Sequence, residues 1–125
     1  WASKSKKSKH KFNYQLMKEL AGGKQMRSLW VDILNDEAQD IWSISTPAKN
    51  EKKHGKHPTQ KPSKLLERII LASTDSCDVI LDPFTGSSTT GVVAIRHDRL
   101  FIGIDNDKEY LELSVKRIED ELDEH

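Results

Sequence analysis

The spacing of apolar residues changes along this chain, and from Ser63 onward it follows a repeating order of helix and strand patterns. Helical spacing over 63–73, 87–96 and 108–121 predicts three helices. Between them, 79–81 and 100–104 are short continuous apolar runs, typical of strands buried on both faces of a parallel sheet. This order predicts an open α/β sheet with parallel neighbouring strands and right-handed crossovers.

The first half of the chain carries one clear helical pattern. Asn13 precedes apolar residues at helical spacing and Gly22-Gly23 follows them, which predicts a helix over 14–21 with an asparagine cap and a glycine stop. Phe12 and Tyr14 are expected to pack under this helix.

The last predicted helix is amphipathic. Its apolar stripe is expected to consist of Tyr110, Leu113, Val115, Ile118 and Leu122. Its charged residues are expected to form a solvated face with helical ion pairs: Glu109, Glu112, Lys116, Arg117 and Glu119.

The segment 79–91 reads V-I-L-D-P-F-T-G-S-S-T-T-G and suggests a cofactor cradle. Asp82-Pro83 ends the strand, Gly86 permits a sharp turn, and the Ser and Thr residues open a helix with free amide groups. Asp105 follows Gly86 by 19 positions (105 − 86), close to the spacing of an acid that binds ribose hydroxyls. Neither G-x-x-x-x-G-K-[ST] nor G-x-G-x-x-G is present, so S-adenosylmethionine, which has a ribose and no pyrophosphate, fits better than a dinucleotide or a triphosphate.

The zero net charge conceals an asymmetry. Residues 1–62 carry 13 basic and 6 acidic side chains (+7), and 63–125 carry 7 basic and 14 acidic ones (−7). A basic half is suited to a polyanion such as DNA, and a solvated lysine-rich surface is the alternative. The lysines expected to contact DNA phosphates lie in two basic stretches: Lys4, Lys6, Lys7, Lys9, Lys11, Lys52 and Lys53.

Composition excludes several other classes of protein and of site. At 125 residues and 35% hydrophobic content, the chain is one domain or less, with no membrane-spanning run and no signal peptide. A single cysteine excludes an internal disulfide, and the histidines lack partners at metal spacing, so no metal site is expected. A reducing cytoplasm is the simplest compartment.

Three motifs together resemble a known family. H-P-T-Q-K-P at 57–62, L-D-P-F-T-G-S-S-T-T at 81–90, and F-I-G-I-D at 101–105 with a nearby E-Y closely resemble the C-terminal half of the β-class amino DNA methyltransferases. These enzymes modify the exocyclic amine of adenine or, less often, cytosine. The resemblance covers about 57–117 and implies a Rossmann-like S-adenosylmethionine-dependent methyltransferase fold, here only the C-terminal part of the parallel sheet plus a recognition region. It implies a target-recognition, DNA-contacting region over 1–55 and an S-adenosylmethionine-binding α/β unit over 56–125.

The resemblance also assigns site residues. Those implied to lie against S-adenosylmethionine are Asp82, Phe84, Gly86 and Ser87, with Asp105 accepting hydrogen bonds from the ribose hydroxyls. Those implied to close over its methionine end are His57, Thr59, Gln60 and Lys61, of which Thr59 and Lys61 could bind the carboxylate. The alternatives are a surface lysine at 61 and a helix cap at 105. Ser88 replaces the second glycine of the usual G-S-G-T-T, which would cost about 1 kcal/mol if that position requires a positive φ.

One family motif is missing. The catalytic tetrapeptide, an acid or serine followed by Pro-Pro and an aromatic residue, does not occur in this sequence. In the β class it precedes the cofactor half, so the expectation is that this chain is a piece, with the catalytic loop upstream of Trp1, and that it does not catalyse transfer to adenine N6 alone. The rival interpretations are a non-catalytic DNA-binding module, a split enzyme with a separate catalytic half, a cytosine-N4 enzyme, and a methyltransferase acting on RNA or a small molecule. The recognition sequence and the oligomeric state, including a homodimer, are left open.

Overall fold

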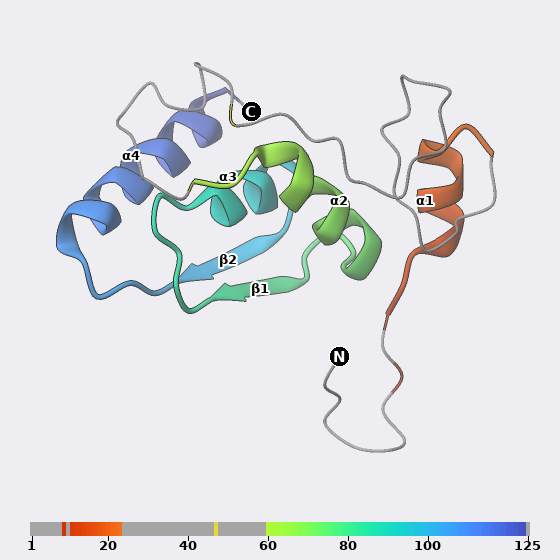
Figure 1. Cartoon of the computed structure of the whole chain (residues 1–125), viewed down its shortest axis with the longest axis horizontal. Helices are drawn as coiled ribbons and strands as arrows, with labels where there is room; N and C mark the ends of the chain where they lie inside the picture. The colour runs from red at the N-terminus through yellow and green to blue at the C-terminus, as the bar shows by residue number, and fades with distance from the viewer. Residues whose placement is uncertain (1–8, 10, 24–46, 48–59, 125) are drawn as a thin grey trace. The chain divides into compact units, whose positions relative to one another are not determined.

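The computed structural model describes residues 9, 11–23, 47 and 60–124. The elements in chain order are α1 (Tyr14–Leu20), α2 (Ser63–Ser73), β1 (Val79–Asp82), α3 (Thr89–Arg96), β2 (Leu100–Gly103) and α4 (Lys108–Asp123) (Figure 1). Every element predicted from residue 63 onward is therefore present in the predicted order. The predicted functional boundary near residue 55 lies outside the described residues. No helix in the described part of the chain is long and apolar enough to cross a membrane.

The chain divides into two compact units. One contains α1 and residues 71–74, and the other contains 60–70 and 75–124. In the second unit β1 and β2 pair in parallel, from Val79 opposite Leu100 to Asp82 opposite Gly103. This pairing confirms the predicted parallel arrangement and places the carboxyl ends of both strands at one edge.

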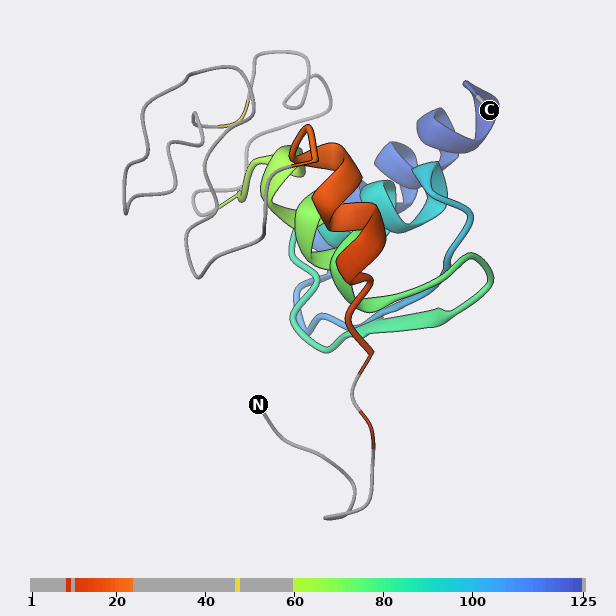
Figure 2. The same ribbon diagram turned by 90° about the vertical axis from the view of Figure 1, so that its right-hand side faces the viewer.

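One face of the two-stranded sheet is covered by helices. The core cluster contains Ile70, Val93 and Ala94, with Leu66, Ile80 and Phe101 packed against it. In two views at right angles, α2, α3 and α4 lie on the same side of the strands (Figures 1 and 2). Gly91 permits α3 to approach β2, because a Cβ built there would lie 2.6 Å from Cε1 of Phe101.

The other face differs from the prediction that the strands are buried on both sides. Val79, Leu81, Leu100 and Ile102 are 59%, 59%, 58% and 52% exposed. Successive side chains of a strand point to opposite faces, so these four point away from α3. No described element of the unit lies against them.

Helix α1 begins after Asn13 and ends before two glycines, as predicted. Gly22 and Gly23 both have positive φ, 65° and 80°. The predicted capping role of Asn13 is wrong, because its side chain makes no cap hydrogen bond to α1. Its amide nitrogen Nδ2 instead donates to the carbonyls of Leu71 and Thr74, each at 2.8 Å. Asn13 therefore connects the start of α1 to the chain segment at the end of α2.

The aromatic residues beside α1 also differ from expectation. Phe12 and Tyr14 are 41% and 43% exposed, and Met17 is the buried residue of this helix. A seven-residue helix has one narrow buried face, and Met17 occupies it.

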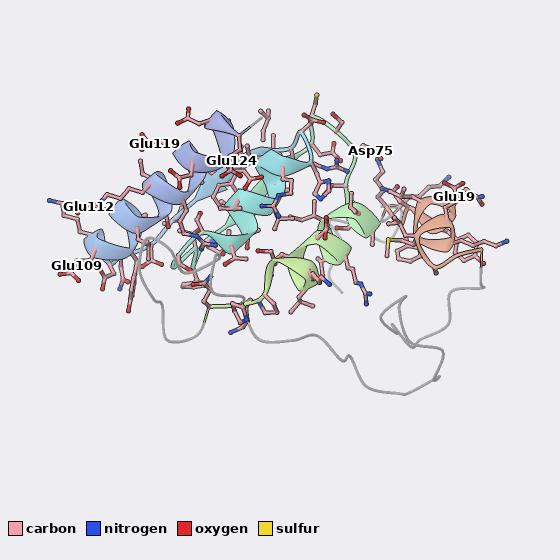
Figure 3. All side chains as sticks on the ribbon, turned by 90° about the horizontal axis from the view of Figure 1, so that it is seen from above. Glu19, Asp75, Glu109, Glu112, Glu119 and Glu124 are labelled. Carbon is pink, nitrogen blue, oxygen red and sulfur yellow. The ribbon has the colours of Figure 1, made fainter. Side chains whose placement is uncertain are left out.

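The buried face of α4 differs in part from the predicted apolar stripe, of which Tyr110, Leu113 and Ile118 are half-buried. Its buried residues are Ser114, Arg117 and Glu121, whereas Val115 and Leu122 are 53% and 55% exposed. The prediction that Arg117 belongs to the solvated face is therefore wrong. The solvated face itself is confirmed at other positions, since Glu109, Glu112 and Glu119 project from the side of α4 that faces away from α3 (Figure 3).

Candidate functional site

The turn between β1 and α3 begins at a carboxylate that fixes both of its ends. Oδ1 of Asp82 accepts a hydrogen bond from the Phe84 amide at 3.1 Å. Oδ2 accepts one from the Thr90 hydroxyl, in the first turn of α3, at 2.7 Å. The last residue of β1 therefore holds the turn against the helix that follows.

The interior of the turn is buried and polar. Residues 85–89 are all buried, and the hydroxyl oxygens of Thr85 and Ser88 lie 2.9 Å apart, within hydrogen-bonding distance. Ser88 has φ 56° and ψ 38°, the left-handed region, so α3 begins at Thr89, two residues after the predicted start. The position where the sequence departs from the family motif therefore does have a positive φ.

A second carboxylate connects this turn to the end of β2. Oδ2 of Asp105 accepts a hydrogen bond from the Gly86 amide at 2.8 Å, and Oδ1 accepts one from the Asp107 amide at 3.0 Å. The 19-residue spacing in the sequence thus corresponds to direct contact. The N-cap of α4 is Asp107, whose side chain accepts hydrogen bonds from the amides of Glu109 and Tyr110. Asp105 is therefore not the cap of this helix.

The predicted site residues around the turn differ in accessibility. Phe84 is 87% exposed, Asp82 and Asp105 are half-buried, and Gly86 and Ser87 are buried. An exposed aromatic ring gains free energy when a ligand covers it. Ligands of open α/β sheets bind outside the carboxyl ends of the strands, which is where Phe84 and Asp105 lie.

The other predicted site residues are only partly described. His57 and Thr59 lie outside the described residues, Gln60 is half-buried, and Lys61 is exposed just before α2. Among the lysines assigned to DNA, Lys9 and Lys11 are exposed, and the remainder lie outside the described residues: Lys4, Lys6, Lys7, Lys52 and Lys53. These assignments stay predictions.

Sequence reasoning missed two residues that contact the turn from α4. The Ser114 hydroxyl donates to the Gly86 carbonyl at 2.7 Å. Arg117 donates from Nη1 to the Ser87 carbonyl and, at 3.4 Å, to the Thr89 hydroxyl. Their spacing could have indicated a shared role, because positions 110, 114, 117 and 121 lie on one face of a helix.

Comparison with known proteins identifies the family. A family model described as DNA methylase matches residues 1–116. The type II methyltransferase M2.DpnII of Streptococcus pneumoniae is 57% identical over 122 residues, which are 97% of this chain and 41% of the relative. The chain spans about two fifths of the length of M2.DpnII and of the type II methyltransferase M2.LlaDCHI of Lactococcus lactis subsp. cremoris.

Two solved structures share the fold. The crystal structure of the M1.HpyAVI–SAM complex matches with a TM-score of 0.57 and 39% identity, over 72% of this chain and 43% of that one. The cytosine-N4-specific PvuII DNA methyltransferase matches with a TM-score of 0.51 and 32% identity, over 66% and 34%. With its two parallel strands and their crossover helix, this chain has part of the DNA methyltransferase fold, and it belongs to the N6/N4 DNA methylase family.

Proposed function

We propose that this chain forms the S-adenosylmethionine-binding portion of a site-specific DNA methyltransferase that modifies N6 of adenine in duplex DNA. The observation that carries the proposal is the 2.8 Å hydrogen bond from the Gly86 amide to Asp105. It joins the glycine turn to the acid at the end of the neighbouring strand, beside the exposed ring of Phe84. The family match supports the methyl-transfer chemistry.

The residues at this edge fit S-adenosylmethionine by their chemistry. The Asp105 carboxylate accepts hydrogen bonds from two backbone amides, and a carboxylate is also the kind of acceptor that ribose hydroxyl donors require. Phe84 offers an apolar ring surface, and we propose that Thr59 and Lys61 bind the methionine carboxylate. Bound S-adenosylmethionine supplies an electrophilic methyl group on a sulfonium sulfur. The role of this chain is to bind and orient that group near a base flipped out of the duplex.

The polar groups that hold the target amine are proposed to come from polypeptide outside this sequence. The Pro-Pro-aromatic tetrapeptide is absent here, and the chain spans 41% of the length of M2.DpnII. The exposed apolar sheet face supports this, because a covering segment would remove Val79 and Leu81 from water. That segment could precede this chain or be a separate catalytic half. The cytosine-N4-specific structural neighbour makes cytosine N4 the second candidate target.

DNA is proposed to contact the basic first half, including the exposed Lys9 and Lys11. A cytoplasmic location, with access to cellular DNA, accompanies this proposal. The rival is a DNA-binding module without cofactor. Its support is Ser88, whose left-handed conformation is costly for a non-glycine residue in the turn.

A chimera tests the proposal against this rival. The matching segment of M2.DpnII is replaced by this chain, and binding of S-adenosylmethionine and methyl transfer to duplex DNA are measured by calorimetry and a radiolabel assay. We expect both activities in the parent chimera. Asp105→Asn keeps an oxygen acceptor for the Gly86 amide and removes the charge, so cofactor affinity should fall about 10- to 100-fold.

The control is Asp123→Asn, at the exposed end of α4, which should bind like the parent chimera. A folded chimera that binds DNA and no S-adenosylmethionine would overturn the proposal in favour of the cofactor-free module. Equal cofactor affinity in Asp105→Asn and Asp123→Asn would overturn the ribose assignment.

A further inference from the structure

The carbonyl side of the glycine turn is held by one face of α4. Ser114 donates to the Gly86 carbonyl at 2.7 Å, and Arg117 donates to the next carbonyl, that of Ser87. The two side chains are three positions apart in the helix, so they project from the same face. Both are buried, at 4% and 8% exposure. Consecutive carbonyls of the turn therefore point into α4.

The amide side of the same turn is held by the segment that leads into α4. Asp105 accepts from the Gly86 amide at 2.8 Å, so both backbone groups of Gly86 are bound by residues of 105–117. The turn also contains two residues with left-handed φ, 51° at Gly86 and 56° at Ser88. Such a conformation persists only where its surroundings determine it. Ser87, whose carbonyl Arg117 binds, lies between these two residues.

We propose that Ser114 and Arg117 are positioning residues, which hold the Gly86–Ser88 turn in its left-handed conformation and so set the position of Phe84 relative to Asp105. That this turn receives S-adenosylmethionine rests on the proposed function. The positioning itself rests on contacts within this chain. Loss of Arg117 would release a buried carbonyl and the Thr89 hydroxyl, and the turn would relax toward commoner backbone conformations.

The alternative is that the hydrogen bonds of Ser114 and Arg117 only stabilise the packing of α4 against α3. The chain contains a matched control for that effect. Arg96 of α3 donates from Nε and Nη2 to the two carboxylate oxygens of Glu121, both at 2.7 Å. This pair joins the same two helices one turn further along α4, and neither of its two hydrogen bonds involves the Gly86–Ser88 turn. Arg96→Gln should therefore loosen the helix contact and leave the turn ordered.

Hydrogen exchange on the full 125-residue chain tests the positioning directly. The reporters are the amides of Gly86 and Ser88, which donate to Asp105 and to the Thr85 carbonyl. We expect Arg117→Gln to speed their exchange about tenfold or more relative to amides of β1 and β2. Arg96→Gln, compared at equal global stability, should leave that ratio at the parent value. Arg117→Lys keeps a charged donor group, although not the guanidinium fork, and should retain part of the protection that Arg117→Gln loses.

A second readout separates this inference from the proposed function. In the M2.DpnII chimera, Arg117→Gln should raise KM for S-adenosylmethionine about tenfold with kcat little changed, and Arg96→Gln should leave both constants alone. Equal acceleration of the reporter amides by both arginine variants would overturn the inference. A parent chimera without cofactor binding would overturn the proposed function, while the exchange ratio still decides the positioning. If Arg117→Gln fails to fold, Ser114→Ala removes one hydrogen bond and should act on the same amides by a smaller factor.

Discussion

Gly91 is the position where α3 comes closest to the sheet, and substitution by alanine tests that packing. A Cβ at Gly91 would lie 2.6 Å and 2.7 Å from Cε1 and Cδ1 of Phe101, and 2.7 Å from Oγ of Ser88. Real Cβ atoms do not tolerate such distances, so the neighbours must move. The Phe101 ring packs against the core cluster of Ile70 and Val93, which leaves it little freedom to shift.

Two opposing contributions decide whether Gly91→Ala raises or lowers the free energy of unfolding. Alanine in place of glycine within a helix gains up to about 1 kcal/mol from propensity. Overpacking of a filled core costs about 1–3 kcal/mol. The contacts at Gly91 lie below 3.0 Å on two sides, which favours the upper part of that range. We therefore expect Gly91→Ala to lower the free energy of unfolding by about 1–2 kcal/mol.

A double-mutant cycle with Phe101→Val isolates the steric term. Valine lacks the δ and ε atoms, so the contacts with the Phe101 ring are removed while the 2.7 Å contact with Oγ of Ser88 remains, and in that background Gly91→Ala should destabilise the chain less than it does in the parent. Urea unfolding of the four proteins gives the coupling energy, expected at about 1–2 kcal/mol. The reasoning is refuted if Gly91→Ala stabilises the unmodified chain by the full propensity gain, or if the coupling energy is zero.

Three further substitutions test other features. Ser88→Gly removes the strain of a positive φ at a serine and loses one hydrogen bond, so the free energy of unfolding should stay within about 1 kcal/mol of the parent value. Ser88→Val places a β-branched residue there and should lower the free energy of unfolding, measured in urea, by more than about 2 kcal/mol. The hydrogen bond to Glu121 raises the pKa of Arg96, and a raised pKa gives stability that is present at lower pH and lost only as pH rises through the folded value. Arg96→Gln should therefore lower the free energy of unfolding by about 1 kcal/mol, and this loss should stay constant from about pH 7 to about pH 10. If chemical denaturation shows that the difference in stability between Arg96→Gln and the parent shrinks over that range, the raised pKa of Arg96 is contradicted. Charge reversal at Lys9 and Lys11 should weaken DNA binding by the chimera and flatten its dependence on salt in filter-binding titrations, and an unchanged salt slope would remove them from the interface.

Much of the fold was predictable because its signals are local. The apolar runs at 79–81 and 100–104, each followed by a polar or turn-forming residue, correspond to β1 and β2 within one residue at each end. The helical pattern at 63–73 matches α2, since it depends on spacing within one face. The contact between Gly86 and Asp105 was also predictable, because parallel neighbouring strands bring their carboxyl ends together.

What could not be predicted depends on tertiary contacts. Arg117 was assigned to water because a charged residue in a helix is usually solvated, yet here a turn distant in sequence supplies carbonyl acceptors for the guanidinium. Asn13 was assigned as a cap because its position before α1 suits one, and acceptors near the end of α2 bind its side chain instead. In both cases a polar side chain has several partners compatible with its chemistry, and the sequence does not rank them.

The contacts of α4 affect how costly it is that Ser88 stands where the family motif has a glycine. Ser88 replaces a motif glycine at a left-handed position, which alone would suggest a weakened turn. The Gly86 amide, the Gly86 carbonyl and the Ser87 carbonyl are nevertheless all bound by one segment, 105–117. Because each of these bonds is made in the left-handed conformation of the turn, they offset a strain of about 1–2 kcal/mol at Ser88. The strain at this position and the polar residues of the buried α4 face are therefore connected, and a substitution in α4 should alter the turn even where it touches no ligand.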